Sequence, residues 1–255
     1  MGNLIRMDLY RMRKAKSFLV YVILAAAFAV ALTPLYELLA LLGRLLTDEV
    51  SLSSKTAKLS DIIANPFPAM NAMLTLLSAS AFFYADMENG YIKNIAGQMP
   101  RKGYTVLSKF IAAIAHNLLF MIVGVAFNLI GTLPFKRIEM GNLAESISVF
   151  GLKFLLAQSL CAVLLLTSSS LRSKSLSSVL AVLMGTGMMW LVYIGIDAGI
   201  SQVIKDYDIA LGNYMPDQLL NADSPKAIRA ILSSLITGGV FLPLAVRIFD
   251  KRDVK

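Results

Sequence analysis

Six long stretches of the chain contain no Asp, Glu, Lys or Arg, and this pattern limits the fold more than any other feature. The stretches are 17 to 26 residues long and cover 17–36, 62–85, 110–135, 154–171, 175–196 and 230–246. A bilayer core about 30 Å thick is crossed by roughly 20 apolar residues of helix. The 255 residues, 57% hydrophobic and 16% charged, leave little sequence for anything else. We therefore expect an all-α membrane protein with six transmembrane helices in a single domain, residues 1–255.

The basic residues are divided unevenly between the segments that connect these stretches. If the N-terminus is cytoplasmic, the cytoplasmic segments contain 15 of the 24 Lys and Arg residues and five of the 16 Asp and Glu residues. An excess of Lys and Arg on the cytoplasmic side is the usual orientation signal of membrane helices. We expect both termini in the cytoplasm. The net charge of +8 then indicates topology and contact with membrane lipid, and we expect no nucleic-acid binding.

Two segments outside the spans have predicted helices of their own. Residues 1–16 place Ile5, Leu9 and Met12 on one helical face with basic residues elsewhere, which is typical of a helix lying in the headgroup plane. The alternative for this segment is a solvated basic tail. Residues 198–228 form a long outer segment with spaced apolar positions. This spacing predicts short helices that lie on the outer membrane face or dip into it.

Motifs for phosphate binding and for hydrolytic chemistry are missing from the sequence. It contains no Gly-Lys dipeptide, so a phosphate-binding P-loop is excluded, and it contains no Gly-x-Ser-x-Gly elbow. With one histidine and one cysteine, a zinc site built from these residues is disfavoured. We expect no enzymatic activity, cofactor or metal on this chain. We also expect His116 to be buried and bonded to a neighbouring helix rather than to relay protons.

Uncharged polar residues occur inside the predicted spans, whereas ionisable residues are nearly confined to their ends. The polar set is Asn71, Ser78, Ser80, Asn117, Asn128, Gln158, Ser159 and Thr186. The scarcity of intramembrane charge argues against an ion-coupled or proton-coupled transporter. Asn71, Ser78, Asn117 and Asn128 are candidates for lining a transport pathway. The alternative is that each of them only bonds one helix to another.

The segment 86–104 is the longest predicted cytoplasmic loop. Glu88 and Asn89 supply acidic and capping groups for the start of a short helix. Gly97 and Pro100 would end that helix after about two turns. A short helix at the inner membrane face could insert into a groove on a cytosolic partner, or the segment could be an ordinary connecting loop.

This loop and both chain ends resemble a known family. The pattern Glu88-Asn89-Gly90-x-Ile92-Lys93-Asn94, followed by Pro100-Arg101 and Ser108-Lys109, resembles the first cytoplasmic loop of ABC-2-type transporter permeases. The opening Asp8-Leu9-Tyr10-Arg11 and the closing Phe249-Asp250-Lys251-Arg252-Asp253-Val254 are similar to the ends of those permeases. The resemblance extends over the whole chain. Within the family, the chain looks most like small bacterial permeases that export peptides or confer immunity to peptide antibiotics.

The resemblance implies the transmembrane subunit of an ATP-driven exporter in the bacterial cytoplasmic membrane. Its substrate would be an amphipathic peptide, either a toxin or an antimicrobial peptide. Two copies of a cytosolic ABC ATPase subunit would bind ATP and Mg, and a second permease copy or a paralogue would complete the pathway. Residues 1–16 would form an interfacial elbow helix and residues 198–228 outer re-entrant helices. The ATPase-coupling residues would be Glu88, Asn89, Gly90, Ile92, Lys93, Asn94 and Arg101.

Three other readings remain open from the sequence. The first is export of a drug, a lipid or a glycan precursor by the same type of machine. The second is an intramembrane enzyme or another class of transporter, which the missing motifs disfavour. The third is a membrane accessory subunit that transports nothing.

Overall fold

Helices form nearly all of the described chain. The computed structural model describes residues 2–47, 56–68, 70–88, 101–170, 173–204 and 210–251. In chain order the elements are α1 (Gly2–Lys14), α2 (Lys16–Thr47), β1 (Thr56–Lys58), α3 (Leu59–Ala64), α4 (Asn71–Glu88), α6 (Tyr104–Thr132), β2 (Arg137–Glu139), α7 (Leu143–Ser170), α8 (Lys174–Gly185), α9 (Trp190–Val203), the 3₁₀ helix η1 (Leu211–Tyr214), α10 (Pro216–Asn221) and α11 (Ala227–Lys251). The expected all-α class is confirmed.

Four of the described helices are long and apolar enough to cross a membrane. They are the first 24 residues of α2 (Lys16–Leu39), and α6, α7 and α11. The pair α8 and α9 would be a fifth, but the two helices are bent by 84° at a short break. The apolar part of α4, Asn71–Ala85, is shorter than these spans. By length and composition, the described chain thus contains four helices that could cross a membrane, or five if the bent pair counts as one.

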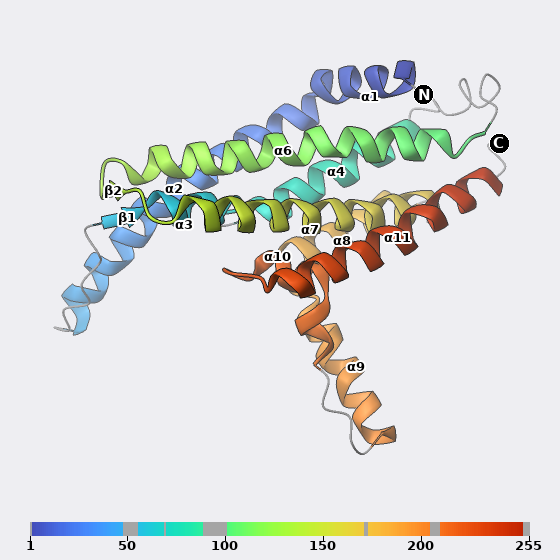
Figure 1. The fold of residues 1–255 in the computed structure, drawn as a ribbon. Helices are drawn as coiled ribbons and strands as arrows, with labels where there is room; N and C mark the ends of the chain where they lie inside the picture. The colour runs from blue at the N-terminus through green and yellow to red at the C-terminus, as the bar shows by residue number, and fades with distance from the viewer. Residues whose placement is uncertain are drawn as a thin grey trace.

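The fifth charge-free stretch is not one straight helix, because it contains a sharp bend that the charge pattern does not predict. Helix α8 ends at Gly185, where the backbone N–H of Thr186 donates to the carbonyl of Val182. Gly187 then adopts a φ of +74°, in the left-handed region that favours glycine. The turn sends α9 away from the bundle (Figure 1), and none of the residues of α9 is buried.

Helix α7 occupies the centre of the bundle. It packs against α3, α4, α6, α8, α10 and α11. Its residues Leu156, Leu160 and Leu164 recur every four positions, so they share one helical face, and all three are buried. They form the main core together with Leu76 and Phe83 of α4. The second, third, fifth and sixth stretches therefore meet around the fourth.

Close backbone contacts fix α6 against its neighbours. A Cβ on Gly124 would overlap the carbonyl oxygen of Pro66, and a Cβ on Gly131 would overlap that of Val30 in α2. Small residues are common where membrane helices approach so closely. At the end of α6, the parallel pair of β1 and β2 joins the segments that follow α2 and α6.

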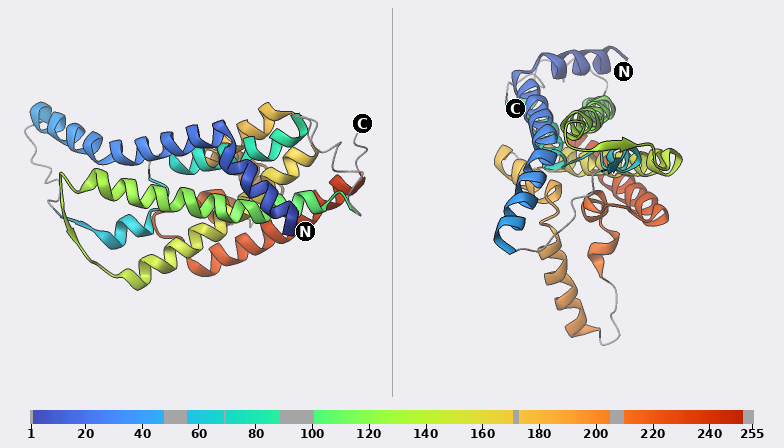
Figure 2. Two further views of the ribbon diagram at one scale, coloured as in Figure 1. Left: turned by 90° about the horizontal axis from the view of Figure 1, so that it is seen from above. Right: turned by 90° about the vertical axis from the view of Figure 1, so that its left-hand side faces the viewer.

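The N-terminal segment is a separate helix, as the sequence predicts. Ala15 separates α1 from α2, and α1 crosses α6 at one end of the bundle (Figure 2). The buried Met12 of α1 packs in a small cluster with Phe18 and Phe120. The final turns of α11 lie at the same end of the bundle as the start of α1 (Figure 1).

Candidate functional site

Three polar contacts join four helices at the end of the bundle that holds α1 and the end of α11. We call five of the residues that make them, Asp8, Gly103, Ser108, Lys109 and Asp250, the junction. In the first contact, the backbone N–H of Gly103 donates to Oδ1 of Asp250 over 2.6 Å. This bond fixes the start of α6 to the last turn of α11. The two residues are 147 positions apart in the sequence.

The second contact joins α6 to α1. The Ser108 hydroxyl donates to Oδ2 of Asp8, and both residues are buried. A hydrogen bond to a carboxylate is stronger than one between neutral groups. Asp8 therefore fixes the position of α1 on the first turns of α6.

The third contact joins α6 to the end of α4. The ammonium group of the buried Lys109 donates to the carbonyl oxygens of Phe82 and Phe83, over 3.2 and 3.1 Å. It also lies 4.9 Å from the centre of the Phe82 ring. Both carbonyls belong to the last two turns of α4, where a positive charge is favourable for the helix dipole. Lys109 thus links α6 to the helix end that precedes the predicted coupling loop.

The predicted ATPase-coupling residues lie next to the junction in the sequence. Glu88 is the last residue of α4, and Arg101 is exposed just before α6. Asn89, Gly90, Ile92, Lys93 and Asn94 lie outside the described residues, as does the short helix predicted there. Both described ends of this segment are anchored by the junction, through Lys109 on the α4 side and through Gly103 on the α6 side.

A chain of buried polar side chains runs from α4 through α6 to α7. Ring atom Nε2 of His116 lies 3.1 Å from the Ser78 hydroxyl, and Nδ1 lies 3.2 Å from Oδ1 of Asn117. The amide of Asn117 donates to Oε1 of Gln158 over 3.0 Å, and the amide of Gln158 donates to the carbonyl of Phe110 over 2.9 Å. The expected burial of His116 and its bond to a neighbouring helix are confirmed.

The hydrogen bonds among these buried polar side chains are consistent with one arrangement of protons. Oδ1 of Asn117 is an acceptor, so Nδ1 of His116 donates to it, and a neutral ring then accepts from Ser78 at Nε2. Removing the Asn117 carboxamide would leave buried groups of His116 and Gln158 without partners. Each such loss costs about 1–3 kcal/mol. These hydrogen-bonded side chains therefore fix the relative positions of α4, α6 and α7.

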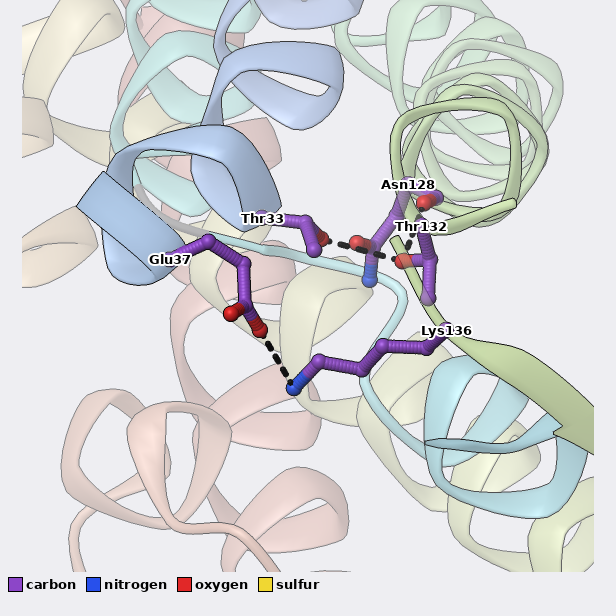
Figure 3. Close-up of polar contacts among 5 residues, drawn as sticks. All are labelled: Thr33, Glu37, Asn128, Thr132 and Lys136. Atoms are coloured by element: carbon purple, nitrogen blue, oxygen red, sulfur yellow. Dashed lines mark hydrogen bonds and ion pairs between the residues drawn. The ribbon is translucent and has the colours of Figure 1, made fainter. Parts of the chain in front are cut away.

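The four pathway candidates do not form one group. Ser78 and Asn117 are joined through His116, whereas Asn71 and Asn128 lie elsewhere. Asn71 is buried at the first turn of α4, and its side-chain amide has no hydrogen-bond partner within the described part of the chain. Asn128 lies near the C-terminal end of α6, one turn before Thr132 (Figure 3).

Polar contacts also join α2 to α6 at the opposite end from the junction (Figure 3). The hydroxyl oxygens of Thr33 and Thr132 are 3.0 Å apart, and the Thr132 hydroxyl lies 2.8 Å from the carbonyl oxygen of Asn128. The Lys136 ammonium lies 3.3 Å from the Glu37 carboxylate, and both side chains are partly exposed. These contacts fix the last turns of α6 against α2.

The segment 198–228, which the sequence predicts to lie outside, contains the predicted short helices, η1 and α10. Asp217 of α10 is buried and accepts a hydrogen bond of 2.7 Å from the Tyr193 hydroxyl of α9 and one of 2.8 Å from the Gln218 amide. Burial raises the pKa of the Asp217 carboxyl above its ordinary value, because desolvation outweighs these hydrogen bonds. Asp197 also accepts from the backbone N–H of Leu211 over 3.0 Å.

Sequence reasoning identified the motif residues but missed how they pair. Asp8, the pair Ser108-Lys109 and Asp250 belong to three separate motifs, and nothing local predicts which of these residues bond to one another. Gln158 was recognised only as one of several polar residues in the fourth stretch. Its pairing with Asn117 depends on the packing of α6 on α7, which no local pattern reveals.

No protein-family model matches the chain, and no curated protein sequence matches it either. Among the described residues, no group of three His, Cys, Asp or Glu side chains is placed to bind a metal ion. The function is therefore inferred from the residues and their geometry.

Proposed function

We propose that this chain is the membrane subunit of an ATP-driven exporter of the ABC-2 type. It would form the pathway for an amphipathic peptide, a toxin or an antimicrobial peptide, in the bacterial cytoplasmic membrane. Two copies of a separate cytosolic ATPase would bind ATP and Mg, and a second copy of this chain or a paralogue would complete the pathway. In this proposal the chain crosses the membrane six times, with α4 and the bent pair of α8 and α9 as the irregular crossings. Both termini lie in the cytoplasm.

The observation that carries the proposal is the junction. It joins the two described ends of the segment 89–100 to α1 and to the end of α11. A force applied to that segment by a cytosolic partner would reach α4 through Lys109 and α6 through Gly103. Asp8 and Asp250 would pass it on to the first and last helices. A loop fastened in this way suits mechanical coupling better than a loose connection does.

The charge pattern supports the proposed orientation of the chain in the membrane and the proposed class of substrate. The junction end carries the basic segments, in agreement with the positive-inside rule. Within the long apolar helices α2, α6, α7 and α11, the buried residues are apolar or uncharged apart from Lys109 of α6 and Lys153 of α7. An amphipathic peptide fits this interior better than a strongly charged solute does, because intramembrane charge is costly.

Copurification with an ABC ATPase from a neighbouring gene tests the proposal. The chain is tagged, co-expressed with that ATPase and purified in detergent, and the bound ATPase is quantified. Glu88→Arg inverts a charge at the start of the predicted contact loop. Glu139→Arg makes the same change on the exposed strand β2 at the far end of the bundle and serves as the matched control.

We expect a stable complex with the unchanged chain and with Glu139→Arg, and loss of most of the bound ATPase with Glu88→Arg. A complex that tolerates Glu88→Arg as well as the control would refute the contact at this loop. If no ATPase copurifies with any form of the chain, the accessory-subunit reading replaces the exporter.

A further inference from the structure

A cavity of about 280 Å³ lies between the elbow helix α1, the start of α2 and α4. One side of it is polar and basic, with Tyr10, Arg11 and Lys14 of α1. The opposite side is formed by small and aromatic residues of α4 and by Phe18 of α2. The ATPase contact does not use this cavity, and of the residues that line it only Ser78 is a pathway candidate. Its size is close to the lower limit of small-molecule sites.

The cavity lies where the aqueous phase would meet the hydrocarbon. Helix α1 ends at Lys14, and α2 becomes continuously apolar from Phe18. Basic side chains just before a membrane span lie at the level of the lipid phosphates, to which they are attracted. Arg11 and Lys14 therefore border the cavity at phosphate depth, and Phe18 borders it at the depth of the first methylene groups.

The residues of α4 that line the cavity form a single stripe. Ser78, Ala81, Phe82 and Ala85 are spaced at i, i+3, i+4 and i+7, so they occupy one face of the helix. The two alanines leave a shallow channel beside Phe82. The stripe ends at Ser78, whose hydroxyl is bonded to the buried His116.

The charges in the cavity favour an anion. The residues that line it include two basic side chains and no carboxylate. Asp8, the only acidic residue of α1, is turned to Ser108 in the junction. A ligand with a phosphate group at one end and a methylene chain at the other matches this arrangement. Arginine and lysine bind the phosphate, and the α4 stripe contacts the methylene chain.

We propose that this cavity binds one anionic phospholipid of the adjacent leaflet. The phosphate lies between Arg11 and Lys14, and the first part of one acyl chain follows the α4 stripe toward Ser78. The rest of this acyl chain lies along the exposed surface of α2. The lipid thereby joins α1 to α4 and supports the orientation of the elbow helix. This site requires no ATPase partner.

Native mass spectrometry of the purified chain tests the site. The probes are phosphatidylglycerol, phosphatidylcholine with the same acyl chains, and inorganic phosphate as a competitor. The double variant Arg11→Gln with Lys14→Gln removes the basic side. Ala81→Trp fills the channel without changing the charge. The matched control, Arg6→Gln with Arg13→Gln, removes two exposed charges from the same helix outside the cavity.

We expect one phosphatidylglycerol to be retained, with about 30-fold weaker binding in the Arg11 and Lys14 double variant, as two basic contacts predict. Ala81→Trp should also weaken binding, and the control should weaken it by less than about threefold. Phosphatidylcholine should bind more weakly, and free phosphate should not compete. Circular dichroism verifies that each variant is folded, and Lys14→Gln alone gives a milder test.

Three results would each overturn the proposal. The first is equal binding by the unchanged chain and by both cavity variants. The second is an equal loss in the control, which would indicate diffuse attraction to α1. The third is full displacement by inorganic phosphate, which would indicate a site for a free anion.

Discussion

The Asp250 carboxylate accepts a 2.6 Å hydrogen bond from the backbone N–H of Gly103, and this bond fastens the last turn of α11 to the start of α6. The bond lies directly after the segment that we propose to contact the ATPase. Gly103 has no room for a larger residue, since a Cβ there would lie 2.7 Å from Cγ1 of Val246. The contact depends on both partners, and each can be changed separately.

Replacing Asp250 by alanine should lower stability and uncouple the ATPase. We expect a loss of about 1 kcal/mol, less than for a fully buried charged hydrogen bond because Asp250 is exposed. Thermal unfolding in detergent measures this loss, and ATP turnover of the purified complex measures coupling. Lys251→Ala alters the exposed neighbour in the same turn and is the control. Equal turnover in the two variants would contradict the role of Asp250 in coupling.

Gly124→Ala should be among the most damaging small substitutions in the chain. The added methyl group would meet the backbone carbonyl of Pro66, which cannot move aside as a side chain can. We expect a loss of about 1–3 kcal/mol, typical of overpacking. Gly151→Ala in α7 is the matched control, because a Cβ there meets nothing within 4 Å. It should be neutral or stabilise by up to about 1 kcal/mol through helix propensity. Thermal unfolding distinguishes the two, and equal melting temperatures would show that the helices are not so closely packed.

Asn117→Ala should destabilise the bundle far more than Asn128→Ala. The first change removes hydrogen bonds to His116 and Gln158 in the interior. Each buried group left without a partner costs about 1–3 kcal/mol. Asn128 makes no such side-chain link between the described helices. Melting temperatures provide the comparison. Export that fails in Asn128→Ala without loss of stability would instead identify Asn128 as a pathway residue.

The folded segment around Asp217 should lose stability as the pH rises. The pKa of Asp217 is raised by burial, so the folded segment favours the protonated carboxyl. The stabilising contribution of that proton is complete below the unfolded pKa of about 3.9 and is lost as the pH rises through the higher folded pKa. Fluorescence of Trp190, the single tryptophan of the chain, reports on the adjoining helix.

Asp217→Asn should remove this pH dependence of the fluorescence, because asparagine does not titrate. Asp223→Asn, a change at an exposed carboxylate in the same outer segment, should leave it intact. A pH profile that survives in Asp217→Asn would assign the change to another group.

The sequence predicted the helices well and their directions less well. Charge-free length marks an apolar helix, and α2, α6, α7 and α11 cover four of the predicted stretches. The same criterion reads straight through Gly185 and Gly187, because glycine is uncharged, so the 84° bend was missed. Individual residues such as Ser78 and Asn117 were recognised as polar residues inside the membrane. Their connection through His116 arises from packing between helices, and hydropathy contains no information about it.

ATP-dependent transport in sealed vesicles tests the central claim most directly. The chain and the neighbouring ATPase are reconstituted together, with the ATPase side facing outward, and uptake of a labelled amphipathic peptide is followed with MgATP. We predict uptake that requires both MgATP and the ATPase, persists with Glu139→Arg and is lost with Glu88→Arg. Uptake that proceeds equally without ATP, or an assembled complex that hydrolyses ATP but moves none of the peptides, drugs or lipids offered, would contradict the account.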